Sequence, residues 1–386
     1  MTVPVTGALP SLAYQWNIID WDFVHGQVKR LQMRIAKAVR QRRWNKVKAL
    51  QWLLTHSISA KLLAVKRVST NKGSRTPGVD NVVWRSPSAR MKGALSLRRR
   101  GYRAQPLRRI LIPKKNKGKR PLGIPVIYDR AMQALHLLAL EPVAEFSADW
   151  NSYGFRVYRA CRDAISQCFC ALAKRYSARW ILEGDIKACF DGISHPWLRE
   201  HILMDTKILD QWLTCGYMQD EKLFPTTAGT PQGGIISPTL ANMTLDGMEK
   251  AIKVSAAGRG QKVNFIRYAD DFVVTAASKD ILVEKVVPVI KEFLEERGLV
   301  LSEEKTHITR IEDGFDFLSQ NVRKFGNKMK ITPALEAVKR FSAKLMETIK
   351  SFRRKKTVEM IRKLNSQWSV GPRIIAISNL PKSSTR

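Results

Sequence analysis

The sequence contains few acidic residues, no long apolar run and no cysteine pattern typical of a metal site or a disulfide framework. Its five cysteines are odd in number and include no C-x-x-C pair, so buried reduced thiols are expected rather than zinc ligands. No stretch of 18 apolar residues is present, which argues against a membrane-spanning helix. The start, MTVPVTGALPSLAYQW, has no basic segment leading into an apolar run and predicts no signal peptide. Together these absences predict a cytoplasmic protein.

The shortage of acids leaves a large positive charge. Lys and Arg number 67 against 33 Asp and Glu, which gives a net charge of +34 and a pI near 10.3. An excess of this size indicates a polyanionic partner, and a phosphate backbone is the usual one because its field and its released counterions both favour binding. A membrane-surface role would need an anchor, and none is visible. We therefore expect nucleic acid as the partner, and no membrane.

The length and composition predict a globular fold. A chain of 386 residues with 44% hydrophobic residues can bury a sizeable core and form two or three structural units. Between Trp21 and His56, apolar residues recur at helical spacing while cations fill much of the remaining surface. One explanation is a core-facing stripe with a solvated stripe; a cationic surface with almost no acids favours a nucleic-acid face. The residues expected to bind RNA there are Arg42, Arg43 and Lys46.

A basic hairpin is predicted farther along the chain. Two short apolar strands, 109–112 and 121–124, flank a turn centred on Gly118. The cations of this hairpin, which could close on a polyphosphate, are Lys114, Lys115, Lys117, Lys119 and Arg120. The following segment, RAMQALHLLALEPVAEF, predicts a helix with one apolar face. We expect its His136 to be a packed residue rather than a ligand.

Three acidic residues lie in stretches whose residues favour β-strands. Asp185 is expected to end the strand of RWILEGD, and Asp270 and Asp271 interrupt the β-rich stretch NFIRYADDFVVTAA where it can turn back. Burying an unpaired carboxylate costs several kcal/mol or more, so such acids need water, a cation or a metal. A solvated turn is the ordinary explanation for an Asp-Asp pair. Carboxylates converging from neighbouring strands could instead bridge two Mg²⁺ ions, as phosphoryl transfer requires.

The two adjacent acids should not be equivalent. Consecutive side chains on a strand point to opposite faces, so the two carboxylates should have different surroundings. We expect Asp270 to be the direct ligand and Asp271 the weaker one.

Several separate motifs resemble those of group II intron-encoded reverse transcriptases, the maturase family. They are TPGVD, NSYGFR, EGDIKACFD, GTPQGGIISPTLAN, RYADDFVV and LSEEKT, and the resemblance extends over about 21–365. It implies an α+β right-hand polymerase fold with fingers, an antiparallel palm sheet flanked by helices, and a helical thumb. The expected domains are 1–106, a basic helical extension with a loop near the fingers; 107–330, fingers and palm; 331–365, partial thumb helices; and 366–386, an irregular tail.

The resemblance also implies residue roles. Asp185, Asp270 and Asp271 are then the catalytic acids that bind two Mg²⁺ ions, with the Ile186 carbonyl completing one metal site. Phe190 matches an aromatic residue that blocks a ribose 2′-hydroxyl, a role compatible with its being a core aromatic. The expected nucleotide-binding residues are Lys114, or Lys115 if the turn register differs, with Arg120, Phe190, Gln232 and Gly233. Lys305 corresponds to a candidate proton donor for the leaving pyrophosphate, or is a solvated surface lysine.

Two features depart from the family pattern. Ser319 stands where family members have the glycine of F-L-G. The resemblance ends after EMIRKLN, without the G-W-x-N-Y-H-like stretch of the thumb and without a Cys- and His-rich endonuclease region. One hypothesis is a truncated intron protein, with a frame change as a cause of the truncation; the other is a divergent branch with its own short tail.

The leading prediction is an RNA-directed DNA polymerase that extends a DNA primer with deoxynucleoside triphosphates and also binds a group II intron RNA to assist splicing. The alternative is a polymerase-inactive, maturase-like RNA-binding splicing cofactor, or a degenerate truncated intron protein. A third possibility is a reverse transcriptase recruited to another task, such as defence against phage. Intact Asp185, Asp270, Asp271 and Gln232 favour the enzyme, because a pure RNA binder needs no metal ligands.

Overall fold

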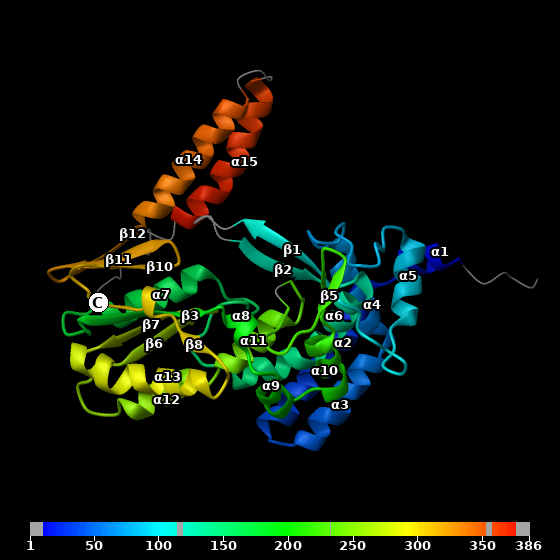
Figure 1. Ribbon diagram of the computed structural model, residues 1–386, viewed down its shortest axis with the longest axis horizontal. Coiled ribbons are helices and arrows are strands. Elements are labelled where there is room, and N and C mark those ends of the chain that lie inside the picture. Colours follow the sequence, from blue (N-terminus) through cyan, green and yellow to red (C-terminus); the bar gives the residue numbers. More distant parts are fainter. Residues whose placement is uncertain (1–10, 114–118, 232, 353–356, 376–386) are drawn as a thin grey trace, which may run out of the picture. The chain divides into compact units, whose positions relative to one another are not determined.

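The computed structural model describes residues 11–113, 119–231, 233–352 and 357–375, the last seven of these by their backbone alone. The chain divides into two compact units, each assembled from separate stretches of sequence (Figure 1). The first unit comprises the residues up to Ala148 together with Ala188–Asp246 and Glu296–Leu299. The second unit comprises Asp149–Lys187, Gly247–Glu295 and the residues from Val300 onward.

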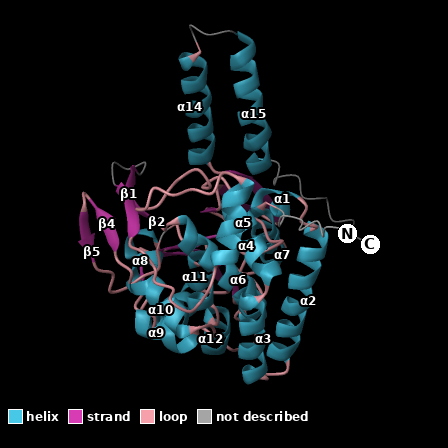
Figure 2. Ribbon diagram, turned by 90° about the vertical axis from the view of Figure 1, so that its right-hand side faces the viewer, coloured by secondary structure: helices cyan, strands magenta, loops and turns pink. Residues whose placement is uncertain are grey.

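The first unit is built around a long buried helix, α6 (Ile127–Ser147), against which α2, α3 and α4 pack (Figure 2). The helices that precede it are α1 (Leu12–Asn17), α2 (Trp21–Arg40), α3 (Trp44–His56), α4 (Ile58–Thr70) and α5 (Pro87–Ser96). Those that follow it in this unit are α8 (Cys189–Gly192), α9 (His195–His201), α10 (Thr206–Thr214) and α11 (Ser237–Leu245). The predicted His136 is buried on α6 with its ring edge-on to Trp212, and burial lowers its pKa to about 4. It is a packed residue, as expected.

The predicted basic hairpin is confirmed and is longer than expected. Strands β1 (Leu107–Pro113) and β2 (Lys119–Ile124) pair antiparallel, with Arg108 opposite Ile124. They form a four-stranded sheet with β4 (Tyr217–Gln219) and β5 (Lys222–Phe224), in the order β2-β1-β4-β5. Lys114, Lys115 and Lys117, in the expected turn, lie outside the described residues.

The second unit contains the sheet that carries the acids. Its strands are β3 (Trp180–Lys187), β6 (Asn264–Tyr268), β7 (Asp271–Ala276), β8 (Val300–Leu301) and β9 (His307–Arg310), paired antiparallel with β3 at the centre. Helix α7 (Cys161–Leu172) covers one face; the π-helical turn η1 (Ile281–Val286), its continuation α13 (Val287–Glu295) and α12 (Met248–Ser255) lie on the other (Figure 1). An antiparallel sheet flanked by helices is the fold that the motifs predicted.

A smaller sheet and two helices complete the second unit. Strands β10 (Phe315–Phe317), β11 (Gln320–Phe325) and β12 (Lys328–Pro333) form an antiparallel meander, and the one-turn 3₁₀ helix η2 (Glu303–Lys305) precedes β9. Helices α14 (Leu335–Ser351) and α15 (Thr357–Ile375) follow and pack against each other. Of the described residues, none belongs to a helix long and apolar enough to cross a membrane.

One local expectation, the end of the strand at Asp185, was wrong. Five short strands lie between Val300 and Pro333, because β8 and β9 pair with β3 while β10–β12 form their own sheet. The two helices that follow begin at Leu335, because Pro333 still belongs to β12. Asp185 does not end β3, which continues to Lys187 through its pairing with β8.

The tail expected to be irregular from residue 366 is helical as far as Ile375. Its helix is supported by contacts with α14: Thr348 and Gln367 exchange side-chain hydrogen bonds, and the rings of Phe341 and Trp368 lie 6.0 Å apart. These tertiary contacts stabilise a segment whose own sequence has weak helical periodicity. Residues 376–386 lie outside the described residues.

Candidate active site

The strand register places two of the three acids opposite each other. β3 and β7 pair so that Asp185 faces Asp271. Directly opposite residues of an antiparallel pair project from the same face, with Cβ atoms about 4.5–5.5 Å apart. Ile181, four residues from Asp185, and Val273, two residues from Asp271, are fully buried in the core beneath α7. The acids therefore continue the buried face of the sheet to a place where Asp185 is half-buried and Asp271 is exposed.

Asp270 lies in the two-residue turn that joins β6 to β7. Its partner in the turn, Ala269, has a left-handed backbone with a φ of +59°, a conformation that costs a non-glycine residue about 1–2 kcal/mol. The side chain of Arg267, which is fully buried, donates from Nη1 to the Ala269 carbonyl at 3.3 Å. This bond helps to fix the turn that carries Asp270.

The NSYGFR motif supports the same turn. The backbone of Arg267 in β6 exchanges hydrogen bonds with Asn151 and Tyr153, at 2.8 and 2.9 Å, so this stretch lies along the edge of the sheet. Gly154 then passes so close to the turn that a Cβ on it would lie 2.3 Å from the backbone nitrogen of Ala269. Sequence reasoning used the motif only to recognise the family and missed this positioning role.

A second close approach lies next to Asp185. Gly184 pairs with Phe272, and a Cβ on Gly184 would lie 2.2 Å from the Phe272 ring. The ring therefore occupies the space that any other residue at position 184 would need. The only sequence signal was a glycine inside a strand pattern, which often marks a close approach of this kind.

Lys305 is in direct contact with one of the acids. Its Nζ lies 2.7 Å from Oδ2 of Asp185, and this hydrogen bond, with the charges of all three acids, raises the pKa of the lysine. The pKa of Asp271 is raised to about 6, first by loss of hydration and then by the negative charges of Asp270 and Asp185, although its side chain still reaches solvent. The cluster thus has more negative charge than one lysine neutralises.

A cavity of about 240 Å³ opens beside these groups. It is lined by Glu183, Gly184, Asp185, Asp271, Phe272, Val273, Lys305, Asp316, Phe317 and Leu318. Asp316, which the sequence analysis did not single out, brings another acid to this cavity. Its wall includes part of the β10–β11 turn, where Leu318 and Ser319 both have positive φ, as a type I′ turn requires. Ser319 therefore has a left-handed backbone conformation, which glycine adopts without strain.

The acids fit magnesium by their chemistry. Mg²⁺ prefers a few carboxylate oxygens with retained waters over a full protein cage, and Asp185 and Asp271 offer such oxygens on one face. Within the described ranges no three Asp, Glu, His or Cys side chains are already arranged to hold an ion. Ile186, whose carbonyl was expected as a further ligand, follows Asp185 in β3 and has a buried side chain. The register pairs Asp271, rather than Asp270, with Asp185. That Asp270 is the direct metal ligand stays a prediction.

The expected nucleotide-binding residues belong to the first unit. Phe190, in α8, is half-buried and its carbonyl accepts a 2.6 Å hydrogen bond from the Thr230 backbone. Phe190 and the loop Gly229–Pro231 line a cavity of about 380 Å³. Gly233 has a φ of +119° and packs on the end of β2, where its added Cβ would lie 2.6 Å from the Gly123 oxygen.

The remaining candidates lie on exposed segments or outside the described residues. Arg120 is exposed on β2. Lys114 and Gln232 lie outside the described residues. The expected RNA-binding residues Arg42, Arg43 and Lys46 are all exposed at the junction of α2 and α3.

Comparison with known protein families agrees with this fold. Residues 112–322 match the model of the reverse transcriptase (RNA-dependent DNA polymerase) family, and residues 16–97 match the N-terminal domain of reverse transcriptase. The first match spans more than half of the chain. The protein therefore belongs to the reverse transcriptase family.

Individual relatives narrow the assignment of the protein within this family. Protein YkfC of Escherichia coli is 31% identical over 67% of this chain and 79% of its own length. The group II intron-encoded protein LtrA of Lactococcus lactis is 36% identical over a stretch that covers 49% of this chain and 33% of LtrA. The resemblance to group II intron-encoded reverse transcriptases is thus confirmed. Among solved structures, a Candida tropicalis telomerase in complex with a TWJ fragment of telomeric RNA is 15% identical, with a TM-score of 0.45 over 71% of this chain and 54% of its own.

Changing Gly154 to alanine tests the close approach at the acid hairpin. The new methyl group would overlap the backbone of Ala269, so Gly154→Ala should lower the free energy of unfolding by about 1–3 kcal/mol, the usual cost of overpacking. Gly26→Ala is the matched control, because nothing lies within 4 Å of its added Cβ in helix α2 and alanine favours helix by about 1 kcal/mol. Urea unfolding of both variants measures their free energies of unfolding. Equal stability of the two would contradict the assigned contact.

Proposed function

We propose that the chain is an RNA-directed DNA polymerase that extends a DNA primer on an RNA template and uses Mg²⁺. The observation that carries the proposal is the placement of Asp185 and Asp271 opposite each other on paired strands, with Asp270 in the adjoining turn. A fold has little reason to hold like charges together unless a cation joins them. We assign the catalytic part to residues 107–330, which encloses the matched family segment.

Each candidate residue would have its own role in this reaction. Asp185, Asp270 and Asp271 would hold two Mg²⁺ ions with the Ile186 carbonyl, and the ions when bound supply positive charge for the attacking and leaving oxygens. Lys305, which is hydrogen-bonded to Asp185 at 2.7 Å, would be the proton donor for the leaving pyrophosphate. Lys114 and Arg120 would hold the triphosphate, Phe190 would exclude a 2′-hydroxyl, and Gln232 with Gly233 would lie beneath the incoming base pair.

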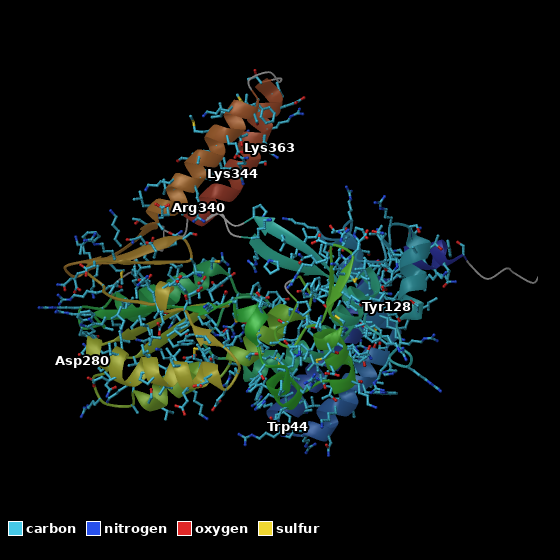
Figure 3. All side chains as sticks on the ribbon, viewed as in Figure 1. Trp44, Tyr128, Asp280, Arg340, Lys344 and Lys363 are labelled. Carbon is cyan, nitrogen blue, oxygen red and sulfur yellow. The ribbon has the colours of Figure 1, made fainter. Side chains whose placement is uncertain are left out.

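A second candidate function is binding of intron RNA to assist its splicing. It is supported by the net charge of +34 and by the similarity to the intron-encoded LtrA. Exposed cations occur at the α2–α3 junction and on the terminal helices, where Arg340, Lys344 and Lys363 are examples (Figure 3). The two functions are compatible, and a chain that has only the second would bind RNA without extending a primer.

Replacing Asp270 separates the two functions. Asp270→Asn removes one negative charge and one strong oxygen ligand at nearly constant shape, so primer extension with Mg²⁺ should fall by orders of magnitude. RNA affinity should be unchanged, because phosphate binding depends on lysine and arginine. Primer extension and RNA binding are measured on the same preparations.

The matched control is Asp280→Asn, which removes an exposed acid from the same unit but not from the cavity (Figure 3). This variant should extend primers like the wild type. If wild type and Asp270→Asn both gave the same residual extension, the polymerase assignment would be excluded and RNA binding would remain.

Sugar selection is tested at Phe190. Phe190→Ala should raise the incorporation of ribonucleotides relative to deoxynucleotides, because the ring is proposed to fill the space that a 2′-hydroxyl needs. Phe23→Ala, at an exposed aromatic of helix α2, controls for ring removal in general. Unchanged discrimination in a folded Phe190→Ala protein would assign the ring to the core alone.

RNA affinity should fall steeply with salt, since each phosphate contact releases counterions. Replacing Arg42, Arg43 and Lys46 together by glutamine should make the plot of log affinity against log salt shallower, by about 0.7 per lost contact to single-stranded RNA. The rate of nucleotide incorporation within the bound complex should not change. A nearly flat plot for the wild type would contradict the electrostatic basis of binding.

A further inference from the structure

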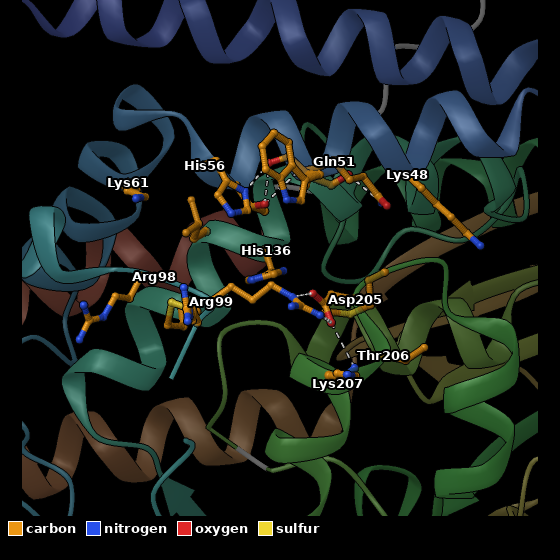
Figure 4. A pocket seen from close by; sticks show the side chains of 17 residues that line it. Lys48, Gln51, His56, Lys61, Arg98, Arg99, His136, Asp205, Thr206 and Lys207 are labelled. Carbon is orange, nitrogen blue, oxygen red and sulfur yellow. Dashed lines mark hydrogen bonds and ion pairs between the residues drawn. The ribbon is translucent and has the colours of Figure 1, made fainter. Parts of the chain in front are cut away.

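The first unit contains a basic cavity that the proposed polymerase chemistry does not use. Its volume is about 550 Å³, within the range typical of small-ligand sites, and it lies among α3, α6, residues 98–100 and the start of α10 (Figure 4). The cations that line it are Lys48, Lys61, Arg98, Arg99, Arg100 and Lys207. They come from four separate segments of the chain and face one cavity.

The charge of this cavity is poorly balanced. Its one lining acid, Asp205, already forms an ion pair with Arg99 and caps α10 by accepting a hydrogen bond from the Lys207 backbone at 3.1 Å. Within the described residues the structure gives none of the other five cations an acidic partner. Like charges gathered around one cavity repel each other, so the site favours a ligand with several negative groups.

An aromatic platform stands beside these cations. The rings of Trp52 and His56 stack with centroids 4.1 Å apart and planes inclined by 24°. The His56 ring donates from Nδ1 to the Trp52 carbonyl at 2.8 Å, which fixes its orientation. Trp52 is 58% exposed, so the stacked pair still has surface for another ring.

The floor of the cavity is uncharged and is held in place by hydrogen bonds. Buried Gln51 donates hydrogen bonds to the carbonyls of Ala139, at 3.3 Å, and Leu203, at 2.9 Å, and so joins α3 to α6 and to the segment before α10. His136 lies at the same floor and is uncharged at neutral pH, because burial lowers its pKa to about 4. A neutral floor, an aromatic platform and a cationic rim match a base linked to phosphates.

We propose that this cavity binds an unpaired nucleotide of an RNA strand, with its base on the Trp52–His56 platform and the neighbouring phosphates on the cations of the rim. A strand fits better than a free mononucleotide, because the cations exceed what one phosphate needs. A duplex does not fit, because its bases already stack on one another and cannot reach Trp52. This inference rests on the RNA-binding part of the proposed function and not on polymerase activity.

The test uses a short oligouridylate RNA that contains one 2-aminopurine, whose fluorescence is quenched when the base stacks; uracil stacks weakly, so the free probe is bright. The wild type should bind and quench this probe, and Trp52→Ala should bind it about tenfold to a hundredfold more weakly and lose the quenching. Trp52→Phe should restore most of the binding, because it keeps an aromatic face. Trp44→Ala is the matched control, since Trp44 is an exposed tryptophan of the same helix outside the cavity (Figure 3).

Other outcomes would overturn the inference. Equal binding by Trp52→Ala and Trp44→Ala, equal binding of the probe annealed to its complement, or displacement by micromolar AMP would each exclude an unpaired RNA nucleotide as the occupant. Primer extension by the same preparations distinguishes the two proposals. A wild type that fails to extend primers yet shows Trp52-dependent quenching would remove the polymerase assignment and leave the cavity assigned to RNA.

Discussion

The pairing of β3 with β7 is the interaction on which the site depends. Its register sets Asp185 opposite Asp271, at a distance where two carboxylates repel each other in the absence of a cation. The same strands bury Ile181 and Val273 in the core beneath α7. A slip of one residue would turn this apolar set to the wrong face, so the hydrophobic core fixes the register and the repulsion is tolerated.

Close backbone approaches then leave the acid hairpin little freedom. Gly154 lies against Ala269 and Gly184 lies under Phe272, and neither position has room for a Cβ. Buried Arg267 holds the carbonyl of the turn. Packing of this density transmits small changes to the acids and restricts the backbone that carries them.

The positive charge of the chain is a separate feature from the acid cluster. Repulsion among exposed cations is weakened by salt and water, whereas a strand of phosphates binds many of them at once. The structure shows that some of these cations are not simply spread over the surface. Arg98, Arg99 and Arg100 line one cavity with Trp52, which combines charge with a stacking surface. Composition alone cannot distinguish such a site from a solvated face.

The sequence by itself determined the family, the antiparallel sheet flanked by helices, and the basic hairpin, because these depend on local periodicity and on motifs of contiguous residues. Only the tertiary structure decided that Asp271 faces Asp185, since register is set by packing across strands far apart in sequence. It also decided the helix beyond residue 366, which contacts with α14 support, and the φ of Ser319, which the β10–β11 turn imposes. The cavity around Trp52 is lined by segments more than 150 residues apart in sequence, from Lys48 to Lys207. A local sequence pattern does not show that such segments lie side by side.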